Sequence, residues 1–246
     1  MAKPKLVMLA DTERCVNCKA CEVACRAEWN TPLGFNRNWV VETFSVSDDG
    51  VPHMDLISGR CQHCDDAPCV TNCPSGASYQ RDDGVVLVDR EFCSGCEMCV
   101  TVCPYDARFK NPLDDKISKC TFCQPRIDAG EQPACVEVCF NRALIFGDIN
   151  DPNSEVSQLL EQEKWQKLVT DKVDTKPNHY YSESAYLDSS VLPQEKQPTV
   201  QAEVLSKVVN PVVSLGFTGM LGLFGAAGVM KIIKRREEVS NDSHSE

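Results

Sequence analysis

Cysteine is the residue type that most constrains what this chain can form. Its 246 residues include 16 cysteines, several times more than a packed core of this size uses. They fall into four groups of four, and no cysteine is left over. The groups are Cys15, Cys18, Cys21 and Cys25; Cys61, Cys64, Cys69 and Cys73; Cys93, Cys96, Cys99 and Cys103; and Cys120, Cys123, Cys135 and Cys139. This regularity predicts that the thiols act together as ligands.

The spacing inside the groups indicates iron–sulfur clusters. Groups one and three follow C-x2-C-x2-C-x3-C, the run with which bacterial ferredoxins hold [4Fe-4S] clusters. Three thiolates on one tight loop reach three irons of a single cubane, and the amide N–H groups of the loop point at the anionic cluster. The fourth thiolate faces away and binds the other cluster of a two-cluster unit. The sequence therefore predicts four [4Fe-4S] clusters.

Two other uses of cysteine fit this pattern less well. Disulfides suit small secreted chains, whereas this chain is long and its cysteine triplets lie too close together to bridge one another. Structural zinc needs two C-x2-C pairs separated by a finger or a ribbon, a description that only group four matches. Three cysteines within seven residues, as in groups one and three, wrap a tetrahedral ion poorly.

Proline indicates which groups belong together. It follows the fourth cysteine only in groups two and three, as Pro74 and Pro104. These two groups are predicted to form one ferredoxin-like module, joined by a strand at 85–88 and inserted between the halves of an outer ferredoxin-like module made by groups one and four. The alternative is sequential pairing, one with two and three with four. The expected fold class is α+β, with the outer module at 5–52 and 111–150 and the inserted module at 53–110.

The segment 151–208 contains no cysteine. From Ser154 onwards, an apolar-periodic run predicts a capped amphipathic helix that continues to about Val169. The stretch from Lys176 to Thr199 is expected to be extended, and either to bind a partner subunit or to act as a solvated linker.

A transmembrane helix is predicted near the C-terminus. The twenty residues Pro211–Met230 carry no charge, and as a helix they span ~30 Å, one hydrocarbon thickness. We place the anchor at 209–233 and a polar tail at 234–246. Basic residues follow the span at Lys231, Lys234, Arg235 and Arg236. The positive-inside rule then places the tail in the cytoplasm and the cluster-binding part on the periplasmic face of a bacterial inner membrane. The N-terminus shows no export signal, so export in the folded state with a signal-bearing partner is expected.

The order of the four groups and the motifs around them resemble a known family over roughly residues 5–181. This family is the four-cluster electron-transfer subunit of complex iron–sulfur molybdoenzymes, which include polysulfide, thiosulfate and dimethyl sulfoxide reductases and respiratory formate dehydrogenase. The segments that carry the resemblance are Cys64–Cys69, Pro104–Phe109, Ser118–Cys123 and Phe146–Asp148. The core is most similar to the polysulfide and thiosulfate branch, whereas the C-terminal helix resembles the anchor of formate dehydrogenase.

The resemblance implies the nested pairing and a ligand set for each cluster. Carried over position by position, the ligands are Cys15, Cys18, Cys21 and Cys139 for cluster 1; Cys120, Cys123, Cys135 and Cys25 for cluster 2; Cys61, Cys64, Cys69 and Cys103 for cluster 3; and Cys93, Cys96, Cys99 and Cys73 for cluster 4. It also implies two partners, a molybdopterin-type catalytic subunit (Mo or W) facing cluster 1 and an integral membrane quinone-reactive subunit facing cluster 4.

The expected function is therefore a non-catalytic relay of electrons between a quinone or quinol subunit and the catalytic subunit of a respiratory oxidoreductase. Three alternatives are a reductase acting at its own cluster, a four-cluster subunit of a membrane-bound hydrogenase, and a free polyferredoxin carrier. The net charge of −11 argues against nucleic-acid partners, since such domains are normally basic.

Several residues close to the ligands in sequence are candidates for tuning the clusters. The cations are Arg14, Lys19, Arg108, Lys110, Lys119 and Arg126. A positive charge stabilises a reduced cluster and raises its potential, but each of these side chains is also typical of a plain surface cation. His63 lies between two cysteines and is interpreted as packing beside a cluster.

Overall fold

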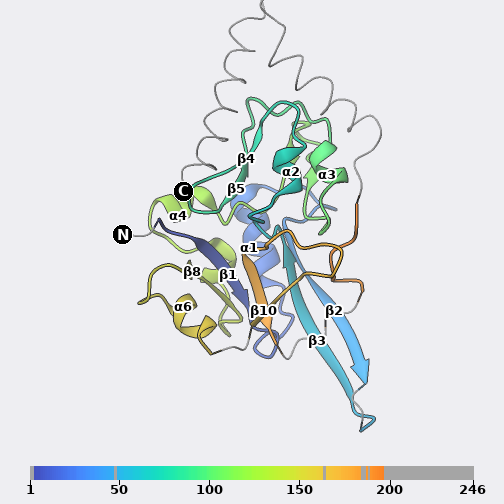
Figure 1. Ribbon diagram of the computed structural model, residues 1–246, viewed down its shortest axis with the longest axis vertical. Helices are drawn as coiled ribbons and strands as arrows, with labels where there is room; N and C mark the ends of the chain where they lie inside the picture. Colours follow the sequence, from blue (N-terminus) through green and yellow to red (C-terminus); the bar gives the residue numbers. More distant parts are fainter. Residues whose placement is uncertain (1–2, 47–48, 163–164, 184–186, 188, 197–246) are drawn as a thin grey trace, which may run out of the picture.

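The computed structural model describes residues 3–46, 49–162, 165–183, 187 and 189–196. Within these residues, short strands and short helices are mixed along the chain (Figure 1), in agreement with the α+β prediction. The predicted anchor at 209–233 and the tail at 234–246 lie outside the described residues. In the part that is described, no helix has the length and apolar character needed to cross a membrane.

The largest sheet has four strands in the order β8-β1-β10-β9. Their bounds are Leu6–Ala10 for β1, Leu144–Asp148 for β8, Trp165–Lys167 for β9 and His179–Ser182 for β10. The interior strand β1 runs antiparallel to β8 and parallel to β10. Its side chains alternate between faces: Met8 packs into the core that contains several cysteines, whereas Val7 and Leu9 pack with Val156 of α6 (Glu155–Leu160). The sheet thus separates the cysteine sites from a small covering layer.

The helix that begins after Ser154 is shorter than predicted. Ser154 caps it as expected, because its hydroxyl accepts a hydrogen bond from the amide of Ser157 (3.1 Å), but α6 ends at Leu160 rather than near Val169. The chain then forms β9, which pairs with β10 at the sheet edge, and Leu168 is buried in the cysteine-containing core. The apolar residues that look like one helical stripe therefore pack into two different cores, those of α6 into one and Leu168, just after β9, into the other.

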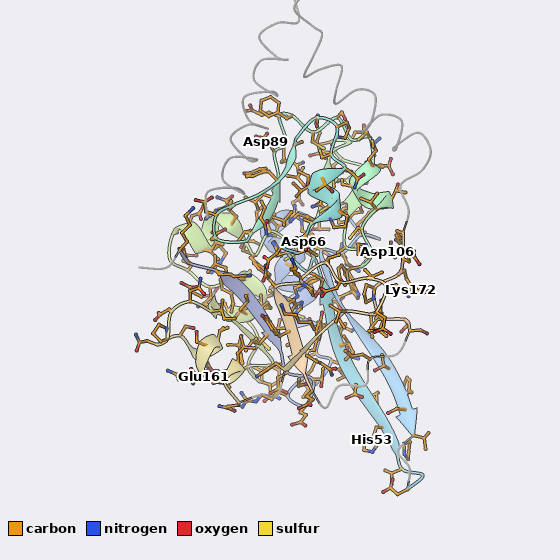
Figure 2. The ribbon with its side chains drawn as sticks, viewed as in Figure 1. His53, Asp66, Asp89, Asp106, Glu161 and Lys172 are labelled. Carbon is orange, nitrogen blue, oxygen red and sulfur yellow. The ribbon has the colours of Figure 1, made fainter. Side chains whose placement is uncertain are left out.

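A long two-stranded hairpin projects from the body of the molecule (Figure 1). It consists of β2 (Asn38–Val46) and β3 (Pro52–Arg60), which pair over nine residues. His53 lies near its far end (Figure 2). At the base, Gly59 pairs with Trp39, and a Cβ on Gly59 would lie 2.3 Å from the indole nitrogen. Only glycine leaves room for the indole there, and Trp39 and Ile57 of the hairpin base pack into the core that contains cysteines.

The four cysteine groups share one local architecture, in which a helix contains the third cysteine. These helices are α1 (Ala20–Trp29), α2 (Pro68–Thr71), α3 (Met98–Thr101) and α5 (Ala134–Glu137), with α4 (Gln124–Asp128) preceding α5. Two small hairpins follow groups two and three, β4 (Ser78–Gln80) with β5 (Val86–Val88) and β6 (Phe109–Lys110) with β7 (Ile117–Ser118). The strand predicted at 85–88 is β5. Helix α1 packs against α5, and α2 against α3, so the first and last groups meet, as do the middle two.

Candidate metal centres

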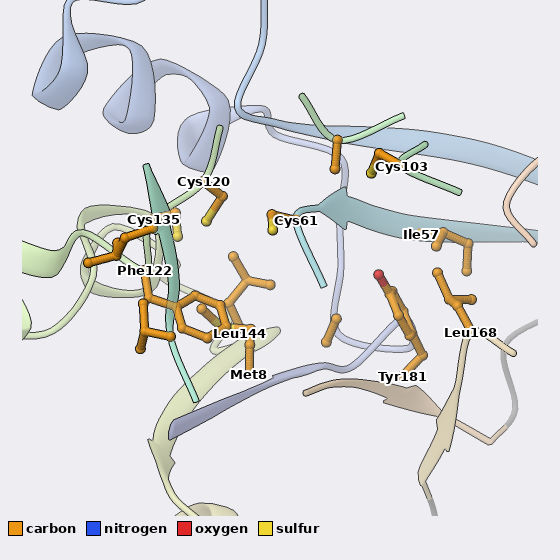
Figure 3. Close-up of a cluster of buried hydrophobic side chains, with 14 residues drawn as sticks. Met8, Ile57, Cys61, Cys103, Cys120, Phe122, Cys135, Leu144, Leu168 and Tyr181 are labelled. Carbon is orange, nitrogen blue, oxygen red and sulfur yellow. The ribbon is translucent and has the colours of Figure 1, made fainter. Parts of the chain in front are cut away.

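All 16 cysteines lie in the described residues, and none of them forms a disulfide. Eleven are buried, and Cys15, Cys21 and Cys139 are half-buried. Cys18 and Cys96 are the two exposed ones. The thiols therefore gather inside the protein, where several of them share a core with Met8 and with other apolar side chains (Figure 3).

Three hollows are each lined by four cysteines, three from one group and the fourth from another. Site 1 has Cys15, Cys18, Cys21 and Cys139; site 2 has Cys25, Cys120, Cys123 and Cys135; site 4 has Cys73, Cys93, Cys96 and Cys99. Cys25 of group one thus lies with cysteines of group four and not with group two. Among the described residues, no three His, Cys, Asp or Glu side chains converge tightly enough to hold a single metal ion. Each quartet surrounds a space instead.

The remaining four cysteines form site 3, in the interior. They are Cys61, Cys64, Cys69 and Cys103, and all of them are buried. The thiol of Cys64 interacts electrostatically with those of the other three, and Cys103 interacts with Cys61 and Cys69. The cysteines that the family resemblance assigns to one cluster therefore lie close to one another in each of the four sites.

The backbone of the cysteine loops has one unusual conformation in common. The residue before the second cysteine has a positive φ in every group, at Asn17 (54°), His63 (45°), Gly95 (69°) and Phe122 (51°). This conformation is uncommon for residues other than glycine and costs of the order of 1–3 kcal/mol each. It turns amide N–H groups inwards and makes an anion-binding nest; the amides of Asn17 and Phe122 donate to the thiols of Cys15 and Cys120. The sequence did not indicate it, because three of the four residues are not glycine.

The segment that leads into β10 holds the loop of group two in place. The Thr175 hydroxyl donates to the Cys64 sulfur (3.0 Å), and the Asn178 side chain donates to the carbonyl of His63 (2.8 Å). The amides of Asp65 and Asp66 donate to the carbonyls of Lys176 and Thr175. Thr175 and Asn178 are functional residues that sequence reasoning missed, because they lie more than 100 residues after the cysteines they support.

Further donors to sulfur lie at sites 2 and 4. At site 2, the indole N–H of Trp29 lies 3.4 Å from the sulfur of Cys123, and the Arg60 guanidinium lies 3.2 Å from that of Cys135. At site 4, the amide of Ser78 donates to the sulfur of Cys73 (3.3 Å). Hydrogen bonds to ligand sulfur stabilise the more negative, reduced state of an iron–sulfur cluster.

Burial raises the pKa of most of the thiols. It is the largest cause at Cys120, whose pKa rises to about 12, and at Cys21, Cys99 and Cys103, whose pKa values rise to about 11. Neighbouring thiols add to the effect because their negative charges repel. These cysteines therefore hold their protons at neutral pH until a cation competes for the sulfur, as metal ligands do.

Four cations are buried beside the thiols without a carboxylate partner. Arg37, Arg60, Arg108 and Lys119 are each at most 7% exposed, and none forms an ion pair with an acidic side chain in the described residues. All three guanidinium nitrogens of Arg108 are buried without an oxygen acceptor, and the group interacts with the thiol of Cys99. Buried cations are costly unless an anion compensates them. Quartets of thiols, inward amides and unpaired buried cations together fit anionic iron–sulfur clusters.

The other cations singled out from the sequence lie elsewhere. Arg14, Lys19, Lys110 and Arg126 pair with carboxylates, and their side chains are between 22% and 52% exposed, so they are screened by solvent. His63 is fully buried and stacks on Phe122 with 3.7 Å between the ring centroids. Its Nδ1 accepts a hydrogen bond from the amide of Val86 (3.0 Å), and burial holds its pKa well below the usual value. A neutral, packed imidazole matches the interpretation from sequence.

Comparisons with known proteins agree with this geometry. Two family models, each described as a 4Fe-4S dicluster domain, match residues 14–77 and 52–149, which together contain every cysteine group. The chain is 42% identical over 180 residues to the B subunit of tetrathionate reductase from Salmonella typhimurium, covering 72% of each sequence. It is 41% identical over 160 residues to the thiosulfate reductase electron transfer subunit PhsB of Salmonella typhi (64% of this chain, 82% of the relative). Over 162 residues it is 41% identical to the B component of polysulfide reductase from Wolinella succinogenes (65% of this chain, 84% of the relative).

Proposed function

The protein belongs to the family of iron–sulfur electron-transfer subunits of respiratory reductases, and from that premise we propose that it relays electrons through four [4Fe-4S] clusters. The electrons pass between a membrane quinone or quinol subunit and a molybdopterin-type catalytic subunit. The chain itself does no substrate chemistry. Bound clusters supply one-electron redox chemistry, and the residues of this chain space, insulate and tune them.

Each site is proposed to hold one cluster through its four thiolates. Cluster 1 is held by Cys15, Cys18, Cys21 and Cys139; cluster 2 by Cys120, Cys123, Cys135 and Cys25; cluster 3 by Cys61, Cys64, Cys69 and Cys103; and cluster 4 by Cys93, Cys96, Cys99 and Cys73. The repeated left-handed residue, the sulfur-directed donors and the unpaired cations support this assignment.

The observation that carries the proposal is the order of the sites and the exposure of their thiols. Cys21 of site 1 lies close to Cys135 of site 2. Cysteines of sites 2 and 3 share one apolar core, and cysteines of sites 3 and 4 share another, so the sites follow one another through the protein. The exposed cysteines, Cys18 and Cys96, belong to sites 1 and 4. A relay that carries electrons between two partner subunits needs an accessible site at each end and insulated sites between them, and this arrangement has both.

The orientation of the wire and its attachment are part of the proposal. Site 1 faces the catalytic subunit, and site 4 faces the quinone-reactive membrane subunit, as the family resemblance implies. A span at 209–233 anchors the chain in a bacterial inner membrane, and the clusters lie on the periplasmic side. Support for the side comes from the basic residues at 231–236.

Co-purification tests the proposed partners. The full-length chain, tagged and extracted anaerobically from membranes in mild detergent, is expected to bring with it a large pterin-containing subunit and a multi-helix membrane protein. Recovery of the chain alone, or with a nickel-containing hydrogenase subunit, would contradict the proposed complex.

The proposed side of the membrane has its own test. In spheroplasts, added protease is expected to cleave the cluster-binding part while a cytoplasmic marker stays intact. Cleavage that occurs only after lysis would place this part in the cytoplasm.

A further inference from the structure

Three of the buried cations lie at the three junctions between successive sites. Arg60, Lys119 and Arg108 are 1%, 1% and 4% exposed. Each lies close enough to cysteines of two neighbouring sites to interact with both electrostatically. We call these three residues the junction cations. All three are close to cysteines in the sequence, since Arg60 directly precedes Cys61, but the approach of Arg60 to Cys21 and Cys135 becomes evident only in the fold.

Arg60 occupies the junction between sites 1 and 2. It is the last residue of β3, and its guanidinium donates to the sulfur of Cys135 in site 2 (3.2 Å) and to the hydroxyl of Ser58. The same positive charge acts on Cys21 of site 1. The hairpin register fixes this residue at the end of its strand, so that a fully buried charge faces both sites.

Lys119 occupies the junction between sites 2 and 3. Its ammonium group donates to the carbonyls of Val86 and of Cys120, the latter at 2.7 Å. Its charge acts on Cys120 of site 2 and on Cys61 of site 3. Two neutral carbonyl acceptors hold the ammonium group in place without cancelling its charge.

Arg108 occupies the junction between sites 3 and 4. Its charge acts on Cys69 and Cys103 of site 3 and on Cys99 of site 4. No oxygen of the described residues accepts a hydrogen bond from its three buried nitrogens, and the polar group that they approach is the thiol of Cys99. Such a group is stable in a core only when an anion compensates it, and the anions available at this position are the thiolates and the sulfides of two clusters.

We propose that each junction cation raises the reduction potentials of the two clusters beside it and offsets the repulsion between them when both are reduced. Each cluster gains one negative charge on reduction, and charges in a protein interior interact far more strongly than in water. A positive charge between two clusters stabilises the electron on either side. Clusters 2 and 3 border two junction cations each, whereas clusters 1 and 4 border one. This inference rests on the proposed four-cluster function, and it identifies the junction cations as groups that set the reduction potentials of the clusters.

The test is a redox titration of the holo-complex, followed by electron paramagnetic resonance, for three charge-removing variants. Arg60→Gln is expected to lower the potentials of clusters 1 and 2, Lys119→Gln those of clusters 2 and 3, and Arg108→Gln those of clusters 3 and 4. We expect at least a tenfold change in the ratio of reduced to oxidised cluster, which is about 59 mV for one electron. This pattern can be recognised before each signal is assigned to a cluster. One redox couple should shift in both Arg60→Gln and Lys119→Gln, and another in both Lys119→Gln and Arg108→Gln. No couple should shift in both Arg60→Gln and Arg108→Gln.

Matched variants separate charge from structure. Arg108→Lys keeps the charge and is expected to restore the wild-type potentials, and Arg90→Gln removes a half-exposed cation paired with Asp114 and is expected to shift none. Wild-type iron content with unshifted potentials in the three variants, or equal shifts of all four couples, would overturn the inference. If one of the three variants loses iron, the redox titrations of the other two still test the inference. Failure of the proposed function itself would appear separately, as missing clusters in the wild-type protein.

Discussion

At the scale of single residues, the hydroxyl of Thr175 is the sharpest probe of site 3. It donates to the sulfur of Cys64 and also contacts the hydroxyl of Tyr105 (2.9 Å). Replacing it in Thr175→Val removes a hydrogen bond of ~0.5–1.5 kcal/mol, so the potential of one cluster is expected to fall by roughly 20–60 mV. A redox titration measures the shift. Thr175→Ser keeps the donor and should leave the potential in place; a valine variant with an unchanged potential would contradict the role of the hydroxyl.

Gly95 provides a second test at this scale. Its φ is +69°, and a Cβ would lie 2.0 Å from the carbonyl oxygen of Asp115, so Gly95→Ala forces the loop of site 4 away from the turn between β6 and β7. We expect the variant to lose the cluster at site 4, about four irons per chain, together with thermal stability. Gly130→Ala is the matched control. Its φ is +78° with open space around it, so it should lose only about 1 kcal/mol and keep full iron content. Equal behaviour of the two variants would show that the clash is unimportant.

At the scale of elements, the sequence predicted local features far better than long-range pairing. The cap at Ser154, the strand at 85–88 and the grouping of the cysteines depend on nearby residues, and the structure has the cap and the strand where they were expected. The pairing of β1 with β10 joins Met8 to His179, and no local pattern encodes a partner so distant in the chain. For the same reason, the support that Thr175 and Asn178 give to site 3 could not be predicted. The prediction that the helix continues to Val169 was wrong, because the residues after α6 form β9 and pair with β10 at the edge of the sheet.

The contribution of β9 and β10 can be tested by truncation. A chain that ends at Lys196 keeps both strands, whereas one that ends at Gln162 loses them together with Tyr181, which is fully buried and donates to the carbonyl of Ser58 (3.1 Å). Iron analysis after anaerobic purification is expected to find wild-type content in the longer chain and a clear loss in the shorter one, with site 3 the first affected. Full iron content in the shorter chain would show that the segment is a dispensable linker.

At the scale of the whole molecule, the fold buries the cysteines of sites 2 and 3 and exposes one cysteine each of sites 1 and 4 at the surface. The chain has a net charge of −11, and the proposed anionic clusters would add negative charge beside the thiols, where the buried cations lie. The four cysteine groups could be identified from spacing alone. The position of Arg60 between sites 1 and 2 could not, because its approach to the thiols of distant groups depends on the hairpin β2–β3, which no cysteine spacing predicts.

The nested arrangement makes a prediction about pairs of substitutions. If Cys25 serves the same cluster as Cys120, the double variant Cys25→Ala with Cys120→Ala should lose no more than one cluster, about four irons. Cys25→Ala combined with Cys64→Ala should lose two, since independent sites add. Iron analysis of the single and double variants measures this difference. Sequential pairing predicts the reverse, a shared loss for Cys25 with Cys64 and an additive loss for Cys25 with Cys120.

The most direct test of the four-cluster wire is the iron and acid-labile sulfide content of the intact, anaerobically isolated protein. Four clusters of four irons and four sulfides each predict about sixteen of both per chain. A value near zero in undamaged protein, or stoichiometric zinc in place of iron, would contradict the account.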